Sequence, residues 1–193
     1  MAVISRDLRF IYIRVPRTGS TTFTHHLNGL MGPLLANIGE QHATACEIRE
    51  LLDPAQLLWD SDYASFGFIR NPWDWLVSVY NSHVSSGAGM SDEWSGIPES
   101  VIAPGMHPGE CTNGPFPEWV RRRKTTPMDW LADGGNVLVD RVLRMEDLYG
   151  DHILNAVKRP DERPHYRDWY DAELADYVGE KCKREIQEGN YVF

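Results

Sequence analysis

Cysteine is scarce in this sequence, and its few copies form no pattern. The 193 residues contain three cysteines, with no Cys-x-x-Cys pair among them: Cys46, Cys111 and Cys182. An odd, scattered set argues against a disulfide framework and is typical of reduced thiols. We therefore expect a protein of a reducing compartment and predict a cytoplasmic location.

Long hydrophobic runs are missing as well. No stretch of 18 consecutive apolar residues occurs, so the sequence predicts no membrane span. The first ten residues, MAVISRDLRF, lack the long apolar segment of a secretory signal. Membrane and secreted classes are therefore disfavoured.

Positive charge is in deficit. Lys and Arg number 19 against 28 Asp and Glu, which gives a formal net charge of −9, and this argues against a nucleic-acid partner. His, Cys, Asp and Glu do not cluster with the spacing of metal ligands, so we predict no metal. What remains is an ordinary globular composition, with 42% hydrophobic and 24% charged residues.

Strand-like and helix-like segments alternate along the chain. Apolar runs predict strands at residues 10–15, 65–70 and 137–143. Periodicity and capping residues predict helices at residues 20–30, 43–52, 118–124, 146–157 and 171–188, and one more that begins at Pro72. This alternation predicts an α/β fold with a central, mainly parallel sheet flanked by helices. We expect one domain, residues 1–193, with a loop-rich insertion at about residues 85–117.

The turn after the first strand is rich in hydroxyl groups and carries a cation. A helix N-terminus offers backbone N–H groups to an anion, glycine permits close approach of the backbone, and arginine adds a permanent charge. Together these groups predict a phosphate cradle made of Arg17, Thr18, Gly19, Ser20, Thr21 and Thr22. The Walker A pattern, Gly-x-x-x-x-Gly-Lys-Ser/Thr, is not met, because the turn has no lysine. The alternative is an ordinary turn whose hydroxyls cap the helix.

A second corner follows the strand at residues 65–70. Arg70 ends this strand, at the edge where open α/β sheets bind ligands. Ser78 lies eight residues further on, on the polar side of the next helix. Arg70 and Ser78 could bind one phosphate together; alternatively, Arg70 forms a salt bridge and Ser78 is simply solvated.

Together, the two corners resemble the cofactor signatures of the sulfotransferase superfamily, whose members use 3′-phosphoadenosine 5′-phosphosulfate (PAPS). Residues 15–21, Val-Pro-Arg-Thr-Gly-Ser-Thr, resemble the 5′-phosphosulfate loop, and residues 70–80 resemble the 3′-phosphate motif. Residues 142–148 resemble a later strand end of the family. The segments 166–171 and 189–193 are similar to the C-terminal part of carbohydrate-type and short bacterial or viral members.

The resemblance implies a P-loop-like three-layer fold and an enzyme, a PAPS-dependent sulfotransferase. Such an enzyme moves a sulfuryl group to a hydroxyl of a glycan or small-molecule acceptor and releases 3′-phosphoadenosine 5′-phosphate (PAP), without a metal. The resemblance also implies that Arg17 and residues 18–22 bind the 5′ end of the nucleotide, with Arg17 also catalytic, and that Arg70 and Ser78 bind its 3′-phosphate. The chain departs from the family at Arg17, where lysine is usual, and at Trp75, where many members have a basic residue.

The acceptor hydroxyl needs a general base. Of the seven histidines, His42 lies just before a predicted helix and between the two cofactor motifs, an interval in which related enzymes often place a catalytic histidine. Histidine titrates near neutrality, which suits this role. We therefore predict His42 as the base, with Glu40 as the second choice; the alternative is that His42 only caps the helix or is exposed at its start.

Two other functions stay open at this point. A nucleotide kinase would need Mg²⁺ and a loop lysine, and the loop here has no lysine. A non-catalytic module could bind the nucleotide without turnover, and Arg17 in place of lysine keeps this possibility open. The basic run at residues 121–124 either guides an anionic acceptor or forms a solvated helix face.

Overall fold

The computed structural model describes residues 2–31, 35–40, 42–52, 63–85, 115–150 and 164–193. The chain divides into two units, each built from two segments. The first comprises Met1–Arg70 and Pro127–Arg159, and the second comprises Asn71–Thr126 and Pro160–Phe193. Most of the insertion predicted at residues 85–117 lies outside the described residues, as does the end of the helix predicted at 146–157.

The first unit is built on a five-stranded sheet. Its strand order is β3-β1-β2-β4-β7, with bounds Leu35–Ile38, Ala2–Ser5, Phe10–Ile13, Ala64–Ile69 and Arg141–Arg144. Strand β4 pairs in parallel with β2 and with β7, whereas β1 is antiparallel to both of its neighbours. Four of these five strands therefore run in one direction, which confirms the prediction of a mixed α/β fold with a mainly parallel sheet.

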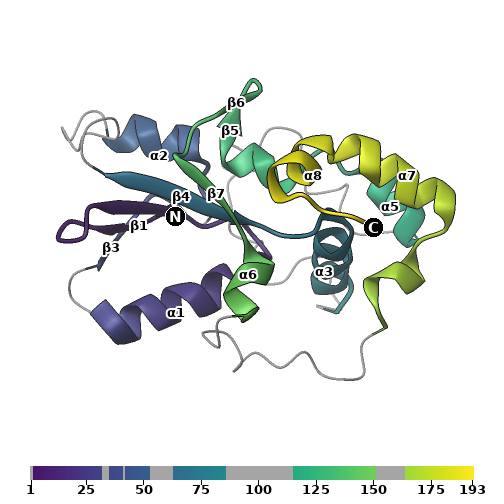
Figure 1. The fold of residues 1–193 in the computed structure, drawn as a ribbon, viewed down its shortest axis with the longest axis horizontal. Coiled ribbons are helices and arrows are strands. Elements are labelled where there is room, and N and C mark those ends of the chain that lie inside the picture. The colour runs from purple at the N-terminus through teal and green to yellow at the C-terminus, as the bar shows by residue number, and fades with distance from the viewer. Residues whose placement is uncertain (1, 32–34, 41, 53–62, 86–114, 151–163) are drawn as a thin grey trace. The chain divides into compact units, whose positions relative to one another are not determined.

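Helices lie on two sides of this sheet. Figure 1 shows α1 (Ser20–Met31) and α2 (Ala45–Leu52) on opposite sides of it. Helix α6 (Met145–Gly150) follows β7 directly. The first unit resumes at Pro127. Between this residue and β7 the chain forms a 3₁₀ helix, η3 (Pro127–Trp130), and a small two-stranded sheet, β5 (Ala132–Asp133) with β6 (Asn136–Val137).

Aromatic rings fill the space between α1 and the face of the sheet that it covers. Tyr12 is fully buried and packs against Phe23 of α1 and Phe68 of β4, with ring centroids 5.0 and 5.5 Å apart. Val3 and Leu27 complete the same cluster. Because strand side chains alternate between faces, Ile11 and Ile13 of β2 and Gly67 of β4 belong to the other face.

Gly67 is the point where Leu131 packs onto β4, so Gly67→Ala should destabilise the protein. An added Cβ would overlap Leu131 Cδ2 and lie 3.3 Å from the backbone oxygen of Ile13. Leu131 is fully buried and cannot move aside freely, so we expect a loss of about 1–3 kcal/mol in chemical denaturation. Gly29→Ala in α1 is the control, because nothing lies within 4 Å of its added Cβ. It should stabilise by about 0.5–1 kcal/mol, and equal shifts in both variants would contradict this packing.

The second unit contains only helices among its described residues. They are α3, α5, η4, α7 and α8, with bounds Pro72–Ser85, Phe116–Arg122, Tyr166–Trp169, Ala172–Lys181 and Lys183–Gly189. Asn71 caps α3, because its Oδ1 accepts the N–H groups of Trp73 and Asp74 at 3.1 and 3.3 Å. The Trp73 indole donates to the Ala175 carbonyl at 3.0 Å and so joins α3 to α7.

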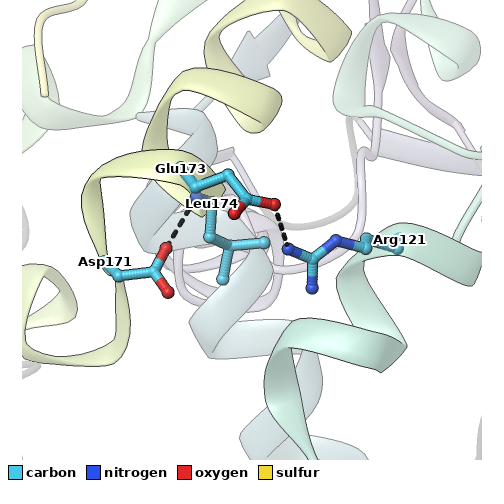
Figure 2. A network of polar contacts seen from close by, with 4 residues as sticks. All are labelled: Arg121, Asp171, Glu173 and Leu174. Atoms are coloured by element: carbon cyan, nitrogen blue, oxygen red, sulfur yellow. Dashed lines mark hydrogen bonds and ion pairs between the residues drawn. The ribbon is translucent and has the colours of Figure 1, made fainter.

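The basic run at residues 121–124 is largely occupied by contacts within this unit. Figure 2 shows Arg121 of α5 paired with Glu173 at 3.0 Å, beside Asp171, which caps α7 by accepting the Leu174 N–H at 2.8 Å. Arg122 pairs with Glu118 at 2.8 Å, and the buried Arg123 lies over the rings of two tryptophans, Trp75 and Trp119. These contacts favour a structural role over guidance of an acceptor.

Several elements differ from their sequence-based predictions. Strands β1 and β3 were not predicted, and the run at residues 137–143 is divided between β6 and β7. The helix predicted at residues 171–188 begins at its expected cap, Asp171, but is interrupted at Cys182 between α7 and α8. In the part of the chain that the structure describes, no helix is long and apolar enough to cross a membrane.

Candidate functional site

The β2–α1 corner places the start of helix α1 at the carboxyl edge of the sheet. Thr18 is fully buried, and its hydroxyl donates to the Val15 carbonyl at 2.8 Å, which closes the turn. Gly19 adopts φ +72°, a conformation that favours glycine. The Phe23 N–H donates to the Gly19 carbonyl at 3.0 Å. The N–H groups of residues 20–22 precede that bond in the first turn, where helices have no intrahelical acceptor.

The side chains of this corner differ in exposure. Arg17 and Thr21 are exposed, Thr22 is half-buried and Ser20 is buried. Arg14, which follows β2 directly, also belongs here, because its Nη2 donates to Thr21 Oγ1 at 3.4 Å. Sequence reasoning missed Arg14. The available signal was an arginine placed immediately after a buried strand, the same position that Arg70 has after β4.

The strand ends of the two predicted corners meet within the first unit. Strands β2 and β4 are parallel neighbours, with Ile13 opposite Gly67, so their carboxyl ends, and with them Arg14 and Arg70, lie at the same edge of the sheet. Arg70 reaches across, and its Nη1 donates to the Arg17 carbonyl at 3.1 Å. Ser78 is on α3 of the second unit, so its partnership with Arg70 stays a prediction.

His42 is held in a tight turn just before α2. The Ala43 N–H donates to the Glu40 carbonyl at 3.1 Å, and His42 adopts φ +61°. A capping box then begins α2: Glu47 Oε2 accepts the Thr44 N–H at 2.7 Å, and Thr44 Oγ1 accepts the Glu47 N–H at 3.2 Å. These bonds fix where α2 begins and hence where His42 lies.

The electrostatic surroundings of His42 keep its imidazole neutral. Burial, helped by the charges of Arg14 and Arg17, lowers its pKa from the ordinary 6.5 to about 4, and a hydrogen bond with the Arg14 backbone acts in the opposite direction. The sequence predicts that His42 titrates near neutrality, whereas burial in the folded protein lowers its pKa well below that range. A neutral imidazole can accept a proton, and the base role stays a prediction.

This shift predicts how stability depends on pH. The pKa of His42 is 6.5 in the unfolded chain and about 4 in the folded chain, so between these values the unfolded chain binds more protons. This contribution to stability is therefore complete above pH 6.5 and is lost as the pH falls towards 4, with a total of about 3 kcal/mol. Wild type should lose more unfolding free energy than His42→Asn between pH 7.5 and 4 in urea titrations. Parallel pH profiles would contradict the shift.

Both residues predicted to be catalytic have a left-handed backbone. Among the described residues, the only non-glycine positions with positive φ are Arg9, Arg17, His42 and Asn190, and Arg17 and His42 are both at +61°. This conformation costs about 1–2 kcal/mol for most residues, and such strain concentrates at functional sites. Arg17 and His42 therefore both need surrounding contacts that hold their backbone in place, and their catalytic roles stay predictions.

The model of the Sulfotransferase family matches residues 1–186. No curated protein and no solved structure matches the chain. Within the described ranges, no three His, Cys, Asp or Glu side chains come together as possible metal ligands.

Proposed function

We propose, from the premise that the chain belongs to the sulfotransferase family, that PAPS is its donor and that a hydroxyl of a glycan or small molecule is its acceptor. Family membership supports sulfuryl transfer in general. The donor, the acceptor class and the release of PAP are our proposal, as is the assignment of residues 1–193 to one sulfotransferase-like domain with a P-loop-like β2–α1 corner.

The bond from Arg70 to the Arg17 carbonyl is the observation that supports this donor most directly. PAPS carries anionic groups at both its 3′ and 5′ positions, so its binding site needs cationic groups or N–H donors at two neighbouring points. Arg17 and the helix N-terminus fit the 5′ end, because Arg17 and Thr21 are exposed and the first-turn N–H groups favour an anion. Arg70, half-buried at the neighbouring strand end, fits the 3′-phosphate.

Each residue then has a defined role in transfer. When bound, PAPS supplies the sulfuryl group and a phosphate leaving group. Arg17 and the N–H groups of residues 18–22 stabilise the negative charge that develops there, a preorganised electrostatic effect. Arg70 and Ser78 hold the 3′-phosphate, and His42 removes the proton of the acceptor hydroxyl.

Calorimetry with PAP in the presence of a chelator tests this assignment. PAP should bind without Mg²⁺ and about ten- to a hundredfold more tightly than AMP, because only PAP presents a 3′-phosphate for a charge-assisted hydrogen bond. Equal affinity for AMP would contradict the 3′-phosphate site. A preference for ATP with Mg²⁺ would instead support a kinase, and PAP binding without transfer of labelled sulfate would support a non-catalytic module.

A further inference from the structure

The indole of Trp130 is bonded to the backbone of His42. Its Nε1–H donates to the His42 carbonyl at 2.8 Å, although the two residues are 88 positions apart. Trp130 is almost fully buried and ends η3. The bond therefore joins a buried, distant segment to the one residue that we predict as the base.

The segment that carries Trp130 is firmly packed. Met128 and Leu131 are fully buried, and Leu131 lies against β4 at Gly67, where a Cβ would leave it no room. The Leu131 N–H donates to the Met128 carbonyl at 3.0 Å, and the Leu131 carbonyl accepts the Leu138 N–H at 2.8 Å. Trp130 thus reaches His42 from a segment that is itself fixed to the sheet.

The His42 backbone needs such support. Its φ of +61° is a conformation that histidine rarely adopts, so surrounding contacts must maintain it. The capping box of α2 fixes the chain after His42, and the Trp130 indole holds the His42 carbonyl itself. The Trp130 bond therefore fixes the peptide plane that follows His42 and helps to maintain its left-handed backbone.

We propose that Trp130 is a positioning residue, which keeps the His42 side chain in place by holding the His42 carbonyl in its left-handed turn. This inference rests on the proposed function for its catalytic consequence, but the coupling between Trp130 and His42 can be measured without turnover. Trp130 touches neither donor nor acceptor in this scheme and acts only through His42.

Trp130→Phe tests the coupling, because it keeps an aromatic ring and removes the N–H donor. Met128→Leu is the matched control, since it alters packing on the same buried turn without touching the bond. In NMR titrations, with the imidazole signals assigned by their absence in His42→Asn, we expect the pKa of His42 to rise by about one unit or more in Trp130→Phe. Met128→Leu should leave it unchanged.

Kinetics give the second readout. In Trp130→Phe, kcat should fall about ten- to a hundredfold, because a small misplacement of a catalytic group has an effect of this size. The KM for PAPS and the affinity for PAP should stay as in Met128→Leu. If Trp130→Phe does not fold, site-specific replacement of Trp130 by benzothienylalanine keeps the bicyclic shape and removes only the N–H group.

An unchanged His42 titration in the folded Trp130 variant would overturn the inference, as would a kcat equal to that of Met128→Leu. Failure of the proposed function has a different signature. In that case the wild type itself fails to bind PAP or to transfer sulfate, while the imidazole titration still decides whether Trp130 positions His42.

Discussion

Replacing Arg70 by alanine is expected to weaken PAP binding about a hundredfold, measured by calorimetry. Loss of one charge-assisted contact to a phosphate accounts for a change of this size. The same variant also removes the hydrogen bond that the wild-type Arg70 Nη1 donates to the Arg17 carbonyl at 3.1 Å. Because Arg17 is in a left-handed conformation, its backbone should hold the 5′ corner less firmly, and both ends of the nucleotide site are then affected.

Two further variants separate specific binding from general charge. Arg141→Ala removes the same charge at the amino end of β7, the strand next to β4, and should leave PAP affinity within about twofold of wild type. Arg70→Lys keeps the charge but loses the planar pair of donors, so its affinity should lie between those of wild type and Arg70→Ala. If Arg70→Ala binds PAP as wild type does, Arg70 does not hold the 3′-phosphate.

The main features of the fold could be predicted because they depend on local sequence. A buried strand followed by a hydroxyl-rich turn predicted the β2–α1 corner, and Pro72 marked the start of α3. Two parallel strands followed by helices place their carboxyl ends at one edge. The sequence could therefore indicate that Arg17 and Arg70 belong to one site, although not that they share a hydrogen bond.

Other features depend on contacts that no local pattern contains. Strands β1 and β3 gain their stability from antiparallel pairing, with each other and, for β1, with β2, and these contacts form only in the folded chain. The Trp130 bond spans 88 residues, and no spacing rule connects a buried tryptophan to a distant carbonyl. The pKa of His42 likewise follows from burial and from Arg14 and Arg17, which are brought to it only by folding.

His42→Asn is expected to lower kcat about 10²- to 10⁴-fold, the usual contribution of a general base, while PAP affinity stays near that of wild type. Asparagine is the better replacement than alanine, because it tolerates the left-handed backbone that His42 adopts at φ +61°. The backbone carbonyl at position 42 can still accept the Trp130 N–H, so the turn is retained and only the imidazole is lost. Transfer of labelled sulfate under saturating donor measures the loss.

Glu40→Gln is the matched control. The backbone carbonyl of Glu40 closes the same turn and is unchanged by this substitution, and the Glu40 side chain is the second candidate for the base. Glu40→Gln should retain most of the wild-type kcat. The reverse result, with full activity in His42→Asn and a loss in Glu40→Gln, would transfer the base role to Glu40. The wild-type pH profile provides a separate check, because kcat/KM reports ionisations of the free enzyme. With a His42 pKa of about 4, protonation of His42 should reduce kcat/KM only as the pH approaches 4, and an inflection near 6.5 that disappears in His42→Asn would contradict this pKa.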